Sequence, residues 1–169
     1  MTAALIVTAE LTPQDFAWLE RLRKTHYPAE RNRVPAHLTI FHALPPSAEA
    51  EVRSRLADLA KSRAPAATIA GLMDLGGGVA FRVVSPDLDT IREQLAHDLH
   101  GLVGAQDVGG WRPHVTIQNK VAPKAARALI ASLQPGFRPR RLAIRGLGLH
   151  RYLGGPWEDV AVYAFRGPS

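Results

Sequence analysis

His37-Leu38-Thr39-Ile40 and His114-Val115-Thr116-Ile117 are two copies of one short pattern: a histidine, an aliphatic residue, a threonine and a second aliphatic residue. Side chains alternate across a β-strand, so the His and Thr of each copy share one face and the aliphatic pair faces the other way. We therefore predict two strands, each with a buried apolar face and a polar face. Two imidazoles and two hydroxyls around one small cavity suit acid–base chemistry on a phosphate ester.

The composition limits the kind of protein this is. A chain of 169 residues that is 46% hydrophobic is long enough for one domain with a sizeable core. The absence of cysteine excludes disulfides, thiolate nucleophiles, Fe–S clusters and thiolate zinc sites. The net charge of +6 favours anionic partners such as nucleic acid or phosphorylated small molecules, although the arginine-rich composition of a GC-rich genome gives the same balance.

The chain also lacks the sequence signals of secretion and membrane insertion. Residues 1–10 have no basic segment before their apolar stretch, and no run approaches the ~18 apolar residues of a membrane span. We expect a cytoplasmic protein without membrane contact.

The expected elements fall into two similar series, each with the order strand, helix, histidine strand, helix and strand. Proline and capping residues mark the helix starts at Thr12, Ser47 and Ser85, and Gly76-Gly77-Gly78 indicates a hairpin. The first series covers 3–8, 12–26, 37–44, 47–60 and 68–75, and the second covers 79–84, 85–99, 114–121, 123–133 and 140–149, with a last strand at 157–165.

The repeated order indicates an internal duplication of residues 3–75 and 79–149 about a pseudo-twofold axis. Such an axis would place the two His-Thr faces opposite each other. No stretch of disordered composition separates the halves. We therefore expect residues 1–169 to form a single domain.

Two such motifs in matching places of a duplicated chain resemble the signature of the two-histidine (2H) phosphoesterase superfamily, also called the 2′-5′ RNA ligase-like family. The late segment 150–157 also resembles the end of many members. The resemblance implies a bilobal, duplicated α+β fold, in which two antiparallel sheets surround a central cleft and helices lie outside. It implies metal-independent hydrolysis of 2′,3′-cyclic phosphates or other 2′-linked phosphodiesters, with reversible 2′-5′ RNA ligation in some members.

By the same resemblance, His37 and His114 are the acid–base pair, and Thr39 and Thr116 hydrogen-bond the phosphate. The chemistry is consistent with this. In-line cleavage of a phosphodiester needs a base on the entering oxygen and an acid on the leaving oxygen. Two imidazoles, with an ordinary pKa of about 6.5, supply one neutral and one charged group near neutral pH. Which histidine is the acid stays open.

Other substrate contacts are expected beside the motifs. The polar face of the second histidine strand continues to Lys120, which would neutralise a phosphate. The first continues to Phe41, which either stacks on a base or fills the core. Many members carry an arginine shortly after a motif, where this chain has Asn119 and Lys120. Further candidates in loops near the expected cleft are Arg31, Arg33, Arg112, Arg151 and Tyr152. His42 alternates away from His37 and is expected outside the cleft.

No cofactor or metal is expected. Neither glycine-rich segment is followed by the Gly-Lys-Ser/Thr of a nucleoside-triphosphate loop, and no Asp or Glu lies at ligand spacing beside either motif. The leading hypothesis is a monomeric phosphodiesterase that acts on a nucleotide cyclic phosphate or an RNA end. Two alternatives are reversible 2′-5′ ligation of RNA at the same site and a catalytically silent module that binds RNA or nucleotides.

Overall fold

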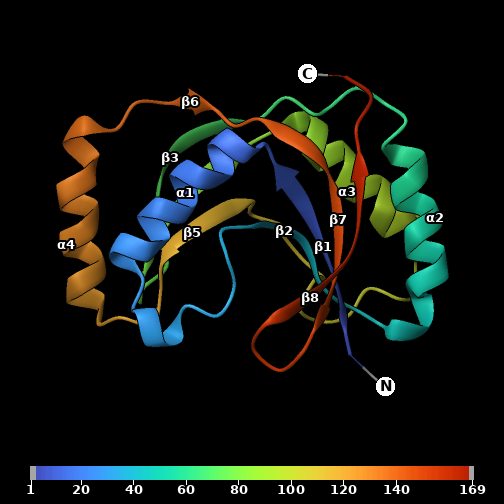
Figure 1. The fold of residues 1–169 in the computed structure, drawn as a ribbon, viewed down its shortest axis with the longest axis horizontal. Coiled ribbons are helices and arrows are strands. Elements are labelled where there is room, and N and C mark those ends of the chain that lie inside the picture. The colour runs from blue at the N-terminus through green and yellow to red at the C-terminus, as the bar shows by residue number, and fades with distance from the viewer. Residues whose placement is uncertain (1–2, 168–169) are drawn as a thin grey trace.

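Two sheets of four strands each form the framework of the computed structural model, which describes residues 3–167 (Figure 1). The strands are β1 (Leu5–Leu11), β2 (Leu38–Leu44), β3 (Thr68–Asp74), β4 (Val79–Val84), β5 (His114–Gln118), β6 (Arg140–Arg141), β7 (Ile144–Tyr152) and β8 (Trp157–Ala164). The first sheet has the order β2-β1-β7-β8 and the second the order β5-β4-β3-β6, with every neighbouring pair antiparallel.

Helices cover the outer sides of the sheets. They are α1 (Pro13–His26), α2 (Glu49–Leu59), α3 (Pro86–Asp98) and α4 (Pro123–Leu133), with short 3₁₀ turns at Ala29–Arg31, Pro46–Ala48 and Gln134–Gly136. As predicted, Ser85 caps α3, because its Oγ accepts a hydrogen bond from the N–H of Leu88 at 3.0 Å. Ser47 does not cap α2, since it lies within a 3₁₀ turn and Ala48 takes the cap position. The predicted α+β architecture with outer helices is confirmed.

The two halves of the chain exchange elements. β3 belongs to the first half but pairs with β4, and β7 belongs to the second half but pairs with β1. Helices also pack on strands of the other half of the chain. Trp18 of α1 stacks on Phe81 of β4 with ring centroids 5.3 Å apart, and Arg92 of α3 lies over Phe41 of β2. Figure 1 shows α1 and α4 beside the second sheet and α2 and α3 beside the first. Both sheets therefore contribute to one cluster of buried side chains.

The two histidine strands, β2 and β5, are edge strands of their own sheets and face each other without pairing. Each contains one extra residue directly after its threonine, Ile40 in β2 and Ile117 in β5. A bulge of this kind disturbs the alternation of side chains. Consequently Phe41 and Gln118, which alternation would turn to the cleft, are buried. The two motifs thus share a backbone irregularity as well as a sequence.

The hairpin between β3 and β4 supports the end of β5. The N–H of Leu75 donates to the carbonyl of Gly78 at 2.9 Å, and the N–H of Val121 donates to the carbonyl of Gly77 at 3.0 Å. Gly78 lies so close to Gln118 that a Cβ at this position would overlap the Gln118 carbonyl. Within residues 3–167, no helix is long and apolar enough to cross a membrane.

We predict that Gly78→Ala destabilises the protein, because backbone on both sides has to shift to admit one methyl group. The expected loss in the free energy of unfolding is about 1–3 kcal/mol. Gly136→Ala is the matched control, since nothing lies within 4 Å of the added Cβ, and it should change stability by less than about 0.5 kcal/mol. Urea denaturation measures both, and equal stabilities would contradict the close contact.

Candidate active site

His37 and His114 have the same local setting at the start of the two edge strands. The Nδ1–H of His37 donates to the carbonyl of Pro35 at 2.8 Å, and the Nδ1–H of His114 donates to the carbonyl of Arg112 at 2.7 Å. A carbonyl oxygen only accepts, so the proton lies on Nδ1 in both rings. Nε2 of each imidazole is therefore left for chemistry.

All four motif side chains line one cavity of about 400 Å³, which we call the motif cavity. The structure thus brings His37, Thr39, His114 and Thr116 together, although residues 41–113 separate the two motifs along the chain. Other parts of the wall come from β2, α3, the loop before β5 and the start of β8, and include His42, Arg92, Trp111, Arg112 and Trp157.

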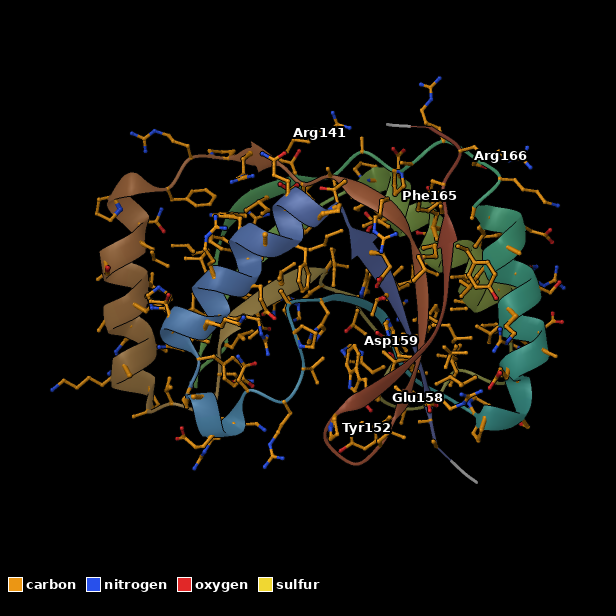
Figure 2. The ribbon with its side chains drawn as sticks, in the orientation of Figure 1. Arg141, Tyr152, Glu158, Asp159, Phe165 and Arg166 are labelled. Carbon is orange, nitrogen blue, oxygen red and sulfur yellow. The ribbon has the colours of Figure 1, made fainter. Side chains whose placement is uncertain are left out.

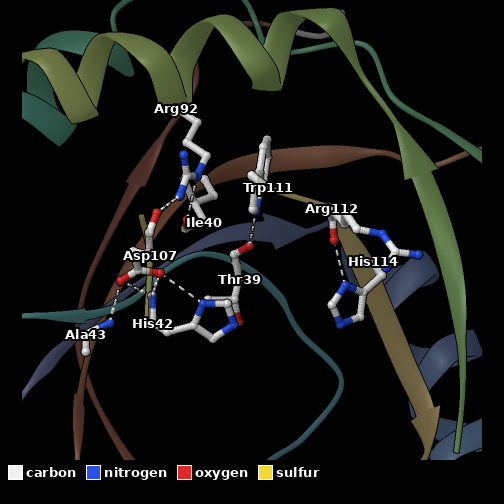
Figure 3. A network of polar contacts seen from close by, with 9 residues as sticks. All are labelled: Thr39, Ile40, His42, Ala43, Arg92, Asp107, Trp111, Arg112 and His114. Atoms are coloured by element: carbon white, nitrogen blue, oxygen red, sulfur yellow. Dashed lines mark hydrogen bonds and ion pairs between the residues drawn. The ribbon is translucent and has the colours of Figure 1, made fainter. Parts of the chain in front are cut away.

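The threonines are held by their backbones and have free side chains. The carbonyl of Thr39 accepts a hydrogen bond from the indole N–H of Trp111 at 3.1 Å (Figure 3). The carbonyl of Thr116 accepts one from Nη1 of Arg23 at 2.9 Å. Neither hydroxyl has a hydrogen-bond partner in the described part of the chain. Both hydroxyls are therefore able to donate to a ligand in the motif cavity.

The surroundings of His37 favour its neutral form. Burial lowers the pKa of His37 to about 4, and the positive charges of Arg23, His114 and His150 act in the same direction, against the hydrogen bond to Pro35. The ring of Trp157 packs on the imidazole, with centroids 4.6 Å apart. At neutral pH the ring is therefore uncharged, and its Nε2 is an acceptor.

A second histidine lies behind His37. Nδ1 of His150 is 2.8 Å from Oδ1 of Asp159, and its Nε2 is 3.6 Å from Oε2 of Glu10. Burial opposes protonation, but these two carboxylates outweigh it and raise the pKa of His150. The ring of Trp157 packs on both histidines, at 5.3 Å from His150. When it is protonated, His150 lowers the pKa of His37.

His42 lines the motif cavity, so the prediction that it lies outside the cleft is wrong. The bulge at Ile40 buries Phe41 and turns His42 back to the side of Thr39 (Figure 3). Its Nδ1 is 3.0 Å from Oδ1 of Asp107, a buried carboxylate. Burial raises the pKa of Asp107, but hydrogen bonds from His42 and neighbouring backbone outweigh it and lower the pKa overall. Two successive apolar residues before His42 were the sequence signal for this bulge.

Phe41 and Arg151, two of the candidate substrate contacts, have other partners in the structure. Phe41 is fully buried under Arg92, so it fills the core and cannot stack on a base. Arg151 is absent from the wall of the motif cavity, and its guanidinium is held between Glu49 at 2.6 Å and Glu158 at 2.8 Å. Local sequence could not indicate this pairing, because Glu49 lies on α2, far away along the chain.

The other predicted contacts lie beside the motifs. Arg112 lines the motif cavity. Lys120 and Tyr152 line a smaller cavity of about 270 Å³ that also includes His37 and Thr116. Figure 2 shows Tyr152 at the end of the β7–β8 hairpin. Their contact with substrate stays a prediction.

A family model decides the identity of this fold and site. The model of the 2′-5′ RNA ligase superfamily matches residues 11–156, which include both motifs. The chain belongs to this superfamily. No curated protein matches the chain.

Several solved structures have the same fold as this protein. TT0787 of Thermus thermophilus aligns over 100% of both chains with 18% identity and a TM-score of 0.68. LigT of E. coli complexed with 3′-AMP aligns over 98% of this chain and 99% of LigT, with 17% identity and a TM-score of 0.58. LigT complexed with NADP+ aligns over the same shares with 20% identity and a TM-score of 0.57. At these identities the likeness concerns the fold alone.

We predict that the imidazole of His37 stays neutral down to about pH 4. The unfolded chain has the ordinary histidine pKa of about 6.5. As pH falls from there toward 4, the unfolded state binds a proton that the folded state does not, so His37 lowers stability in that window and not above it. NMR titration of the ring resonances, assigned with His37→Gln, measures this. A titration midpoint near the ordinary value would contradict the described surroundings.

Asp107 is predicted to hold the edge of β2 independently of His42. Its carboxylate accepts hydrogen bonds from the backbone N–H groups of His42 and Ala43 at 2.8 to 3.0 Å. Asp107→Ala leaves these groups without an acceptor and should cost about 2 kcal/mol or more of unfolding free energy. His42→Ala keeps them and should cost less than about 1 kcal/mol. Equal losses in urea denaturation would show that the imidazole, and not the backbone contact, is what matters.

Proposed function

We propose that this protein is a metal-independent phosphodiesterase that hydrolyses 2′,3′-cyclic phosphates or other 2′-linked phosphodiesters of nucleotides or RNA ends. The observation that carries the proposal is the shared orientation of two imidazoles in one cavity. Each ring is fixed through Nδ1 to the backbone carbonyl two residues before it, and both rings line the motif cavity beside two free hydroxyls. This is a set of groups for moving protons on and off a phosphate ester.

The neutral state of His37 suggests the roles of the two histidines in hydrolysis. His37 is neutral at physiological pH, so its Nε2 takes the proton of the attacking water as the entering oxygen bonds to phosphorus. His114 donates a proton to the leaving 2′ or 3′ oxygen as its bond to phosphorus breaks. Charge on either ring disfavours charge on the other. Acid–base catalysis requires the pair to hold one proton between them.

The threonines contribute without adding charge. Thr39 and Thr116 donate to the two non-bridging phosphate oxygens, whose negative charge has to be held while the bonds to phosphorus change. Support for a reaction without a metal comes from the ligands present. Within residues 3–167, no three His, Asp or Glu side chains are grouped to hold a metal ion.

The same site also supports ligation. There, a hydroxyl of a second RNA end takes the place of the attacking water, so His37 would remove its proton and His114 would protonate the ribose oxygen that leaves phosphorus. We therefore treat 2′-5′ ligation of RNA as a second activity of one site. The following experiment distinguishes both activities from a module that only binds nucleotides.

His37→Ala and His114→Ala should each lower turnover of adenosine 2′,3′-cyclic phosphate by about 10²–10⁴-fold. The double variant should be little worse than either single one, because acid and base act as a unit. Thr39→Val and Thr116→Val should each cost about 1–3 kcal/mol of activation free energy, the scale of a hydrogen bond to a charged group. Assays in EDTA should give the same rates as assays without it.

His97→Ala is the matched control, because His97 is exposed on α3 and lines neither cavity that contains the motifs. Affinity for the 2′-nucleotide product, measured by calorimetry, separates chemistry from binding. If the wild type binds this product but turns over no 2′-linked phosphodiester, the protein is a binding module and the proposal fails.

A further inference from the structure

A positively charged groove leads away from the motif cavity. It is the cavity of about 270 Å³ that shares His37 and Thr116 with the motif cavity. We call it the basic groove and define it by Arg31, Arg33, Lys120 and Tyr152. Arg31 and Arg33 come from the loop before His37, and Lys120 follows the end of β5. The groove thus lies between the segments that carry the two motifs.

The charges of the basic groove are not compensated. No Asp or Glu lines it. Within residues 3–167, neither Arg31, Arg33 nor Lys120 forms an ion pair, although Arg33 also borders the cavity of Glu10 and Asp159. By contrast, Arg151 is held between two carboxylates. Unpaired cations around a concave surface focus a positive potential and attract an anion.

The two walls of the groove are fixed by specific backbone and side-chain contacts. Lys120 has a backbone φ of 61°, a left-handed conformation that is strained for a lysine. Two hydrogen bonds hold it there: Oδ1 of Asn119 accepts from the Lys120 N–H at 2.9 Å, and the carbonyl of Gly77 accepts from the Val121 N–H at 3.0 Å. On the facing wall, Nη2 of Arg23 binds the side chain of Asn32 and the carbonyl of Val34.

We propose that the basic groove binds a second phosphate of the substrate, attached to the 5′ oxygen of the reacting ribose. This inference rests on the proposed function. In a 2′,3′-cyclic phosphate the 2′ and 3′ oxygens of the ribose are both bonded to the reacting phosphorus. An RNA chain can therefore continue from this ribose only through the 5′ oxygen. The preferred substrate is then an RNA end or a 5′-phosphorylated nucleotide, and not a nucleoside cyclic phosphate. Tyr152, exposed at the hairpin end (Figure 2), offers a ring to the preceding base.

Three probes test this: adenosine 2′,3′-cyclic phosphate, the same compound with a 5′-phosphate, and a diadenosine dinucleotide ending in the cyclic phosphate. For the wild type, kcat/KM should be at least about tenfold higher with either second phosphate than without it, as for one hydrogen bond to a charged group. A gain with the dinucleotide alone identifies an RNA chain as the source of the phosphate. A gain with the 5′-phosphate alone identifies a mononucleotide.

Lys120→Asn removes the charge but keeps a residue that tolerates the left-handed backbone. Together with Arg33→Gln it should bring the ratio of kcat/KM values down toward one. Arg127→Gln, which removes one positive charge from the exposed side of α4, should leave the ratio as in the wild type. Raising the salt concentration should lower kcat/KM more steeply for the probes with a second phosphate.

The outcomes separate this inference from the proposed function. Turnover of all three probes with equal kcat/KM would overturn the second-phosphate site and leave the phosphodiesterase assignment intact. A preference that survives both charge-removing variants would also overturn it, because the preference would then arise elsewhere. No turnover of any probe would overturn both.

Discussion

Arg23 makes the contacts on which the geometry of the site depends. Its Nη1 donates to the carbonyl of Thr116 at 2.9 Å, and its Nη2 donates to Asn32 at 2.8 Å and to Val34 at 2.7 Å. One buried guanidinium on α1 therefore joins β5 to the loop that leads into His37. The two histidine strands are edges of different sheets and share no ladder. Arg23 and the indole of Trp111, which donates to the carbonyl of Thr39, are therefore the hydrogen-bonded links that hold these strands at a fixed distance.

The same group influences the protonation of the site. Arg23 is only 3% exposed, and its hydrogen-bond acceptors are neutral oxygens. Burial lowers its pKa, but the ordinary value is so high that the guanidinium stays charged. That charge acts on His37 together with those of His114 and His150. The buried guanidinium therefore helps to keep the imidazole of His37 neutral, which is the state that a general base needs.

The sequence predicted the parts of the site that depend on local periodicity. His and Thr are two residues apart, and over that interval alternation placed both motif pairs on the cavity side. One residue later the extra positions at Ile40 and Ile117 break the alternation, which is why Phe41 was expected in the cleft and His42 outside it. A single inserted ladder position reverses every later side chain of a short strand.

Other features depend on contacts between distant parts of the chain. The repeated order of elements indicated a duplication, but not that β3 and β7 would each pair in the sheet of the other half. Arg151 is bound by Glu49 of α2 and Glu158 of β8. Arg23 is bound by the carbonyl of Val34, in the loop before His37. Nothing in the spacing of these residues specifies their pairing, since tertiary packing determines which charges meet. Composition therefore indicated the sign of the net charge but not its location.

That location matters more than the total. A net charge of +6 is spread over the surface, and at physiological salt its effect fades within about 8 Å. The unpaired cations of the basic groove line one cavity with His37 and Thr116. In the motif cavity the nearest acid, Asp107, is enclosed by backbone N–H groups and His42. An anion that enters the motif cavity therefore meets unpaired positive charge on the side of the basic groove, while the carboxylate of Asp107 is already engaged.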